Sequence, residues 1–295
     1  MQQGLTLPTA YDLGTLDGPV LVFGGPYGNL EAMTALLARA RALGIPPARM
    51  ICTGDVVAYC ADPQACVDLI RGAGIPVVMG NCEESLATGA ADCGCGFTPG
   101  SACDLLSAQW FRCADRDLST DSRAWMGSLP RALGFTLAGR RLRVIHGGVA
   151  QINHFIFASA SAADLKAELD AARVDGIVAG HCGLPFSRLI DGRLWHNAGV
   201  AGMPANDGTA RVWFSLLVPT VAGLRVEHHA LSYDHEAAAK KMTGRGYPES
   251  YAQSICDGLW PSCDILPRAE RQGRGRPVQP SMIHWRTIEL SDAAE

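Results

Sequence analysis

Short apolar runs, each followed at once by a polar or glycine-containing loop, set the pattern of this sequence. The run PVLVF at 19–23 is unbroken and β-branched, as expected for a strand buried on both faces. Over 30–43, leucine, methionine and alanine recur at helical spacing, which predicts a helix that Gly44 ends. The runs RMICTG and IPVVMG predict further strands with a helix between them. This alternation predicts an α/β protein whose ligand site lies beyond the carboxyl ends of its strands.

The later part of the chain changes its pattern. Residues 83–130 predict a helical insertion that carries cysteines. Two β-hairpins are then predicted, with turns at Ala138-Gly139-Arg140 and at Asp191-Gly192. A helix is predicted over 162–172 between them, followed by the strand GIVAG.

We divide the chain into three parts. Residues 1–18 are predicted to be an extension over the surface, because they hold glycine and proline without a periodic pattern. Residues 19–218 form the main domain, and residues 219–295, with one helix near 235–242, form a more polar segment that packs on it.

Composition and charge restrict the kind of protein and partner. Hydrophobic residues make up 48% of the chain and charged residues 18%, which excludes a disordered or fibrous protein. The net charge of −4 provides no basic surface for nucleic acid. No apolar run approaches the ~18 residues that span a bilayer, and the first residues lack the features of a signal peptide. We therefore expect a cytoplasmic protein that binds a small molecule rather than nucleic acid or a membrane, in an oligomeric state that the sequence leaves open.

Polar residues recur directly after the strand-like runs. Among them, Asp55, Asn81, His146 and His181 offer a carboxylate oxygen, an amide oxygen and two imidazoles. This donor set suits a divalent transition metal such as Mn, Fe, Zn or Ni better than Mg or Ca. Taken singly, each residue has an ordinary alternative role in a turn or a hydrogen bond, but their shared position favours one metal site.

In order along the chain, the five loops resemble the signature of the calcineurin-like metallophosphoesterases. The corresponding segments read VFGGPYGNLEAM, CTGDVVAYCADP, VVMGNCEESL, VIHGGV and VAGHCGLPF. The resemblance covers roughly residues 19–218. It implies a four-layer α/β/β/α fold, in which two packed mixed β-sheets are flanked by helices. It also implies hydrolysis of a small phosphomonoester or phosphodiester through a metal-activated water.

The departures from the family pattern fall at the positions that hold one of the family's two metals. Of the four positions that hold the first metal in the family, three read Gly25, Tyr27 and Gly183, and only the shared Asp55 remains. The positions that hold the other metal are complete. The resemblance therefore implies one metal, in a mononuclear or rebuilt site, and leaves the second metal uncertain.

Further site residues follow from the same motifs. Cys82 stands where the family has a histidine that assists the leaving group, and Glu83 at an acidic position that orients the preceding side chain, with a generic surface glutamate as the alternative. Together with His146, these are the predicted catalytic residues. Asn29 and Tyr27, in the first motif, are predicted to contact substrate. His154 is also predicted to contact it, because eight residues separate it from His146 and this spacing places it on the rim of the site. Tyr27 has two alternatives, as a phenolate ligand or as a side chain that fills the space of the missing metal.

The number and positions of the cysteines are the last feature of the sequence that bears on function. Eleven cysteines are too few for a disulfide scaffold, and the odd number argues against complete pairing, so we expect reduced thiols. Cys93 and Cys95, in the insertion, are candidates for additional thiolate ligands. This leaves two alternative functions: soft-metal or thiol redox chemistry that uses Cys82, Cys93 and Cys95, or a non-catalytic module that binds metal or phosphate. Buried cysteines that act as small apolar side chains are the alternative for the thiols themselves.

Overall fold

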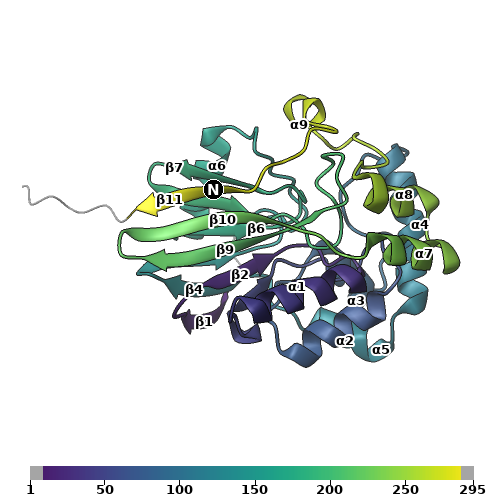
Figure 1. The fold of residues 1–295 in the computed structure, drawn as a ribbon, viewed down its shortest axis with the longest axis horizontal. Helices are drawn as coiled ribbons and strands as arrows, with labels where there is room; N and C mark the ends of the chain where they lie inside the picture. Colours follow the sequence, from purple (N-terminus) through teal and green to yellow (C-terminus); the bar gives the residue numbers. More distant parts are fainter. Residues whose placement is uncertain (1–8, 287–295) are drawn as a thin grey trace, which may run out of the picture.

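Two mixed β-sheets pack face to face in the computed structural model, which describes residues 9–286 (Figure 1). The six-stranded sheet has the order β1-β4-β5-β6-β8-β7, and its strands are Tyr11–Thr15, Leu133–Leu137, Arg140–Val144, Gly176–Ala179, Arg193–Asn197 and Phe186–Ile190. The five-stranded sheet has the order β11-β10-β9-β2-β3, and its strands are Ser281–Arg286, Gly223–Leu231, Val212–Thr220, Val20–Phe23 and Met50–Cys52.

Helices cover the outer faces of both sheets and one end of the molecule (Figure 1). They are α1 Leu30–Ala42, α2 Pro63–Ala73, α3 Asn81–Thr88, α4 Ala102–Asp117, α5 Thr120–Gly127, α6 Ala162–Ala172, α7 His235–Gly244, α8 Glu249–Asp257 and α9 Arg268–Gln272, with a short 3-10 helix at Pro47–Arg49. None of the helices within residues 9–286 is long and apolar enough to cross a membrane.

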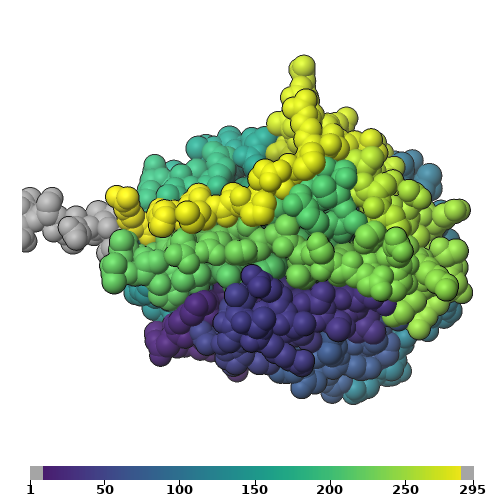
Figure 2. Space-filling model, in the orientation of Figure 1, coloured from purple at the N-terminus to yellow at the C-terminus, as the bar shows by residue number. Residues whose placement is uncertain are grey.

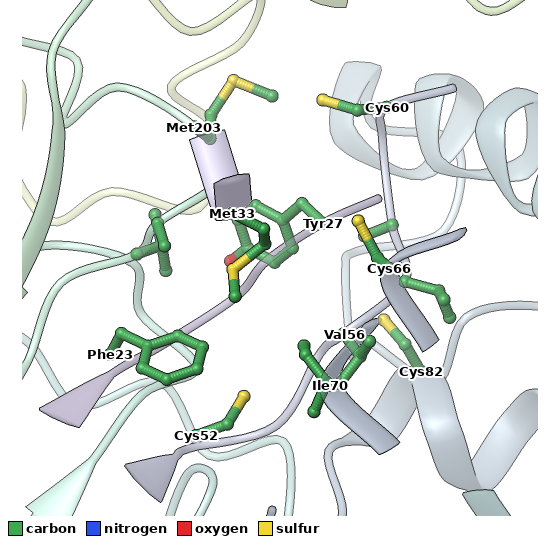
Figure 3. Close-up of a cluster of buried hydrophobic side chains, with 14 of the residues drawn as sticks. Phe23, Tyr27, Met33, Cys52, Val56, Cys60, Cys66, Ile70, Cys82 and Met203 are labelled. Atoms are coloured by element: carbon green, nitrogen blue, oxygen red, sulfur yellow. The ribbon is translucent and has the colours of Figure 1, made fainter. Parts of the chain in front are cut away.

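Clusters of buried apolar side chains pack these elements together. Val22, Val178 and Val226 belong to a cluster with contributions from both sheets, and this cluster fills the space between them. A larger cluster joins the five-stranded sheet to α1, α2 and the insertion, and Figure 3 shows Phe23 and Met33 within it. A third cluster packs α6 on the six-stranded sheet. The order helix, sheet, sheet, helix is the four-layer arrangement that the family resemblance implied, and it confirms that expectation.

Local signals explain most of the element boundaries. The four residues of β2 are fully buried, as the unbroken apolar run predicted. Asn29 begins α1 by accepting a hydrogen bond from the backbone N–H of Ala32 at 3.1 Å. Both predicted hairpins are present, as β4–β5 and β7–β8, and the insertion is helical as expected.

Two predictions about the first half of the chain differ from the structure. The run IPVVMG forms only an isolated bridge, between Cys52 and Val77, because Pro76 has no N–H to give to a ladder and the chain enters α3 at Asn81. Residues 11–15, which were assigned to a surface extension, form the edge strand β1 and pair in parallel with β4.

Residues 219–286 complete the five-stranded sheet. β10 pairs with β9, and β11 pairs with β10, both antiparallel. In the space-filling view, the yellow end of the described chain runs along the green strands (Figure 2). The sequence did not predict these strands, because their alternation places polar side chains such as His228 at buried positions.

Candidate metal centre

The ends of β3, β5 and β6 bring side chains from distant parts of the sequence to one point. Asp55 lies just after β3, and His146 and His181 lie just after β5 and β6. Each of the three offers one ligand atom, and these atoms lie within 4.8 Å of one another. The Asn81 amide, at the start of α3, joins them with its Oδ1 3.0 Å from His146 Nε2. All four predicted ligands therefore meet in a buried cluster.

The nitrogen Nε2 of His146 lies at the centre of this cluster. It is 3.0 Å from His181 Nδ1 and 3.2 Å from Asp55 Oδ2, in addition to the Asn81 contact. His146 Nδ1 donates a hydrogen bond to the Thr53 carbonyl at 2.6 Å, which leaves Nε2 to face the cluster. A single proton on Nε2 cannot serve three such neighbours, whereas a cation can accept a lone pair from every donor. The cluster therefore fits a metal ion.

Hydrogen bonds outside the cluster orient His146 and Asn81. Asn81 Nδ2 donates to the Cys93 carbonyl at 2.8 Å, so the amide oxygen must point toward His146. His181 Nε2 is buried and has no hydrogen-bond partner among the described residues. Nitrogen and oxygen donors of this kind suit Mn, Fe, Zn or Ni.

Burial and the Asp55 charge determine the pKa values of the cluster. Burial raises the pKa of Asp55, but the neighbouring His146 and His181 outweigh it and hold that pKa below its ordinary value. Burial lowers the pKa of His146, but Asp55 outweighs it and raises that pKa. Burial, followed by repulsion from His146, lowers the pKa of His181 to about 3. Asp55 is thus an anion that attracts a cation, and His181 is a neutral imidazole ready to bind one.

Glu83 holds the loop that carries Asp55. Its buried carboxylate accepts hydrogen bonds from the backbone N–H groups of Asp55 at 2.8 Å, Val56 at 2.8 Å and Gly80 at 2.9 Å. These bonds secure Asp55 in a left-handed conformation, with φ of 56°, that aspartate tolerates better than most residues. Burial and the Asp55 charge raise the pKa of Glu83 to about 7. Glu83 is therefore not a generic surface residue but a positioning residue.

Comparison with known proteins identifies the fold family. The sequence profile of the calcineurin-like phosphoesterase superfamily domain matches residues 28–217, which is more than half of the 295-residue chain. The chain belongs to this superfamily. A metallophosphoesterase from Sphaerobacter thermophilus is similar in structure, with a TM-score of 0.66, 20% identity and coverage of 83% of this chain and 100% of that one.

Two further proteins resemble this chain, one in structure and one in sequence. A hypothetical protein from Pyrococcus horikoshii has a TM-score of 0.69 at 15% identity, with coverage of 82% of this chain and 99% of that one. An uncharacterised protein from Methanocaldococcus jannaschii is 39% identical over 62 residues, which are 21% of this chain and 25% of that protein. The chain thus spans about a quarter of the length of this curated relative.

The ring of Tyr27 lies between Gly25 and Gly183, where the family resemblance places ligands of the other metal. A Cβ atom on Gly25, where the family has aspartate, would lie 2.4 Å from Tyr27 Cζ. The Tyr27 hydroxyl lies 3.8 Å from the Cβ position of Gly183, where the family has its last histidine. Burial raises the pKa of Tyr27 well above its ordinary value, so the phenol keeps its proton. Of the two alternatives for Tyr27, the structure favours the side chain that fills the space; Figure 3 shows it among apolar neighbours.

The predicted cysteine roles are not supported by the structure. The sulfur atoms of Cys93 and Cys95 are joined in a disulfide, so neither is a thiolate ligand here and the expectation of fully reduced thiols does not hold. Cys82 is buried, and burial raises the pKa of its thiol well above the ordinary value. The Cys82 backbone N–H lies 3.3 Å from Asp55 Oδ1, and the residue does not line the neighbouring cavity. Cys82 is thus placed to support Asp55 rather than to reach a substrate.

Two of the predicted substrate contacts lie elsewhere. The Asn29 amide makes its hydrogen bonds within the protein. Its oxygen accepts from the Ala32 N–H, and its NH₂ group donates to the Gly202 carbonyl at 3.0 Å and to the Tyr233 hydroxyl at 3.1 Å. His154 is exposed, 3.5 Å from Glu168, and lies outside the cavity. Spacing alone had placed His154 on the rim, and spacing does not determine the direction of a side chain.

A cavity of about 70 Å³ lies beside the cluster, and Asp55 and His181 form part of its wall. Six aromatic side chains line it, namely Tyr27, Tyr59, Phe97, Phe155, Tyr251 and Trp260. Of these, the sequence had singled out only Tyr27. Tyr59 lies in the GDVVAY loop, so its position after a strand was an available signal; the other four carry no such signal.

Proposed function

We propose that this protein is a phosphoesterase that depends on a single divalent transition metal, held by Asp55, Asn81, His146 and His181. The observation that carries the proposal is the convergence of these four donors around His146 Nε2. The filled space at Gly25 supports one metal rather than two. When bound, such a metal supplies a Lewis acid and lowers the pKa of a coordinated water.

The protein's own residues prepare the site for this chemistry. The bond from His146 Nδ1 to the Thr53 carbonyl fixes the ring, and Glu83 fixes the backbone at Asp55. The buried position of the cluster strengthens electrostatic contacts with a phosphoryl group, because few waters compete there. The substrate is a small phosphorylated molecule that enters through the aromatic cavity.

Metal content and hydrolysis test the proposal together. Protein purified without chelators is expected to hold about one equivalent of metal by elemental analysis and to hydrolyse an aryl phosphodiester or phosphomonoester. Asp55→Asn and His181→Ala should each lower the metal content and the hydrolysis rate, since mutations at a metal site cost on the order of tenfold or more.

His235→Ala is the matched control, because His235 is a half-buried histidine at the start of α7, outside the cluster. It should leave both readouts unchanged. Two equivalents of metal in the wild-type protein would contradict the single site. Unchanged metal content in both Asp55→Asn and His181→Ala would refute the ligand set.

A further inference from the structure

We propose that the aromatic cavity binds a flat aromatic group of the substrate, attached to a phosphoryl centre that carries a single negative charge. This inference rests on the proposed function and names its substrate class. A cavity of about 70 Å³ has room for a group of several non-hydrogen atoms, since about 10–15 Å³ is enough for one water. Because Asp55 and His181 form part of its wall, a group bound there lies directly beside the metal ligands.

The aromatic side chains that line the cavity form two groups of rings in contact. In one group, Tyr59 packs against Tyr27 and Tyr251, with ring centroids 4.8 Å apart in both pairs. In the other group, Phe155 packs on His181 at 4.0 Å and stacks with Phe97 at 6.0 Å. A flat ring placed against such side chains gains stacking and edge contacts that a puckered ring does not.

Trp260 is fixed at the same cavity by two hydrogen bonds. Its Nε1–H donates to the Pro204 carbonyl at 2.7 Å, and its backbone N–H donates to Asn206 Oδ1 at 2.8 Å. The indole lies 3.6 Å from the Cβ position of Gly183, so the missing side chain there leaves room for the ring. Trp260 and Tyr251 lie outside residues 28–217, the part that matches the superfamily. Part of the cavity wall is thus contributed by residues outside the matched domain.

The charged groups around the cavity indicate which charge of the phosphoryl group fits there best. Within residues 9–286, no lysine or arginine lines the cavity, and Asp55 is the one carboxylate that does. A divalent metal with one carboxylate ligand carries a net charge of about +1, which balances a phosphodiester monoanion. A dianionic phosphomonoester would lack the cationic side chains that usually clamp it.

Protonated phenols supply hydrogen-bond donors in place of cations. Burial raises the pKa values of Tyr59 and Tyr251 well above the ordinary value, so both hydroxyl groups keep their protons at neutral pH. Neither hydroxyl makes a hydrogen bond to another described residue, and both side chains line the cavity. Phenols can donate to phosphoryl oxygens without adding charge.

Binding of two phosphinate anions tests the aromatic preference independently of turnover. Methyl(phenyl)phosphinate and cyclohexyl(methyl)phosphinate have the same charge and similar size, and their carbon–phosphorus bonds are not hydrolysable esters. Isothermal titration calorimetry on the metal-loaded protein should show about fivefold tighter binding of the phenyl compound. Equal or weaker binding of the phenyl compound would overturn the proposal.

Variants locate the preference in the cavity. Trp260→Leu and Phe97→Leu keep an apolar side chain at half-buried positions and should reduce the fivefold ratio to nearly one. Trp125→Leu is the matched control, a half-buried tryptophan on α5 away from the cavity, and should keep the ratio. A ratio that persists in both cavity variants would place the aromatic group elsewhere and refute the inference.

The source of the aromatic group and the proposed function are tested separately. Tighter binding of adenosine 5′-(methyl phosphate) than of methyl(phenyl)phosphinate indicates a nucleobase, and the reverse order indicates a simpler aryl group. Aromatic preference without any hydrolysis of phosphodiesters would support the binding site and refute the proposed function. Metal-dependent hydrolysis with no preference for aryl over alkyl esters would support the proposed function and refute the aromatic binding site.

Discussion

Replacing Glu83 by glutamine tests whether this buried carboxylate holds the Asp55 loop. Oε2 accepts from two backbone N–H groups, at 2.8 and 2.9 Å, and Oε1 accepts from Val56 at 2.8 Å. Glutamine has one acceptor oxygen, so at least one N–H group is left facing the amide NH₂. An unsatisfied buried donor costs about 1–3 kcal/mol, and the two remaining bonds lose their charge. We expect Glu83→Gln to lower the free energy of unfolding by about 3 kcal/mol.

Urea unfolding monitored by circular dichroism provides the measurement, with metal affinity as a second readout. Glu84→Gln is the control, because Glu84 is the adjacent residue and pairs with Arg131 at the surface, where an ion pair contributes about 0–1 kcal/mol. The reasoning fails if Glu83→Gln and Glu84→Gln lose the same stability. It also fails if Glu83→Gln binds metal as tightly as the wild type, since the Asp55 backbone would then be held by other contacts.

Three further predictions use other parts of the structure. Gly25→Ala should lower the free energy of unfolding by about 3 kcal/mol, because the added Cβ clashes with Tyr27. Gly44→Ala, where the added Cβ meets no atom within 4 Å, should lower it by about 1 kcal/mol. A double-mutant cycle of Gly25→Ala with Tyr27→Ala should show coupling of at least about 1 kcal/mol. Burial lowers the pKa of His228 to about 4 in the folded protein, below the pKa of about 6.5 that a histidine has in an unfolded chain. The unfolded state therefore binds a proton more readily than the folded state. The free energy of unfolding should fall by about 3 kcal/mol as the pH drops from about 6.5 to 4. Urea unfolding across that range should show a weaker pH dependence in His228→Gln, and an unchanged slope would contradict the assignment. Cys95→Ser should keep the metal content of the wild type, because Asn81 is oriented by a backbone carbonyl; loss of the metal would instead indicate a thiolate ligand.

The residues proposed as metal ligands could be picked out from the sequence because three of them stand directly after strands. Asp55 follows a strand of the five-stranded sheet, whereas His146 and His181 follow two neighbouring strands of the six-stranded sheet. The packing of the two sheets brings these strand ends together. The family resemblance gave the same residues. The structure added the hydrogen bonds that orient them and the direction in which Tyr27 points.

The aromatic cavity could not be predicted, because nothing in the sequence links its parts. Phe97 comes from the insertion, Phe155 from a loop after β5, and Trp260 from the segment after α8. Each looks like an ordinary apolar residue until the fold brings them together. The predictions for Asn29 and His154 differed from the structure for a related reason, since position in a motif does not fix hydrogen-bond partners.

The pairing of β2 with β9 sets an order for assembly during synthesis. Val20 lies opposite Leu217, so the strand that leads toward the metal site remains without its antiparallel partner until most of the chain has been made. Contacts this distant in sequence form late and slow folding. His146 and His181 also emerge before residues 212–220. During translation, the nascent chain therefore carries all four proposed ligands before β9 is available to pair with β2.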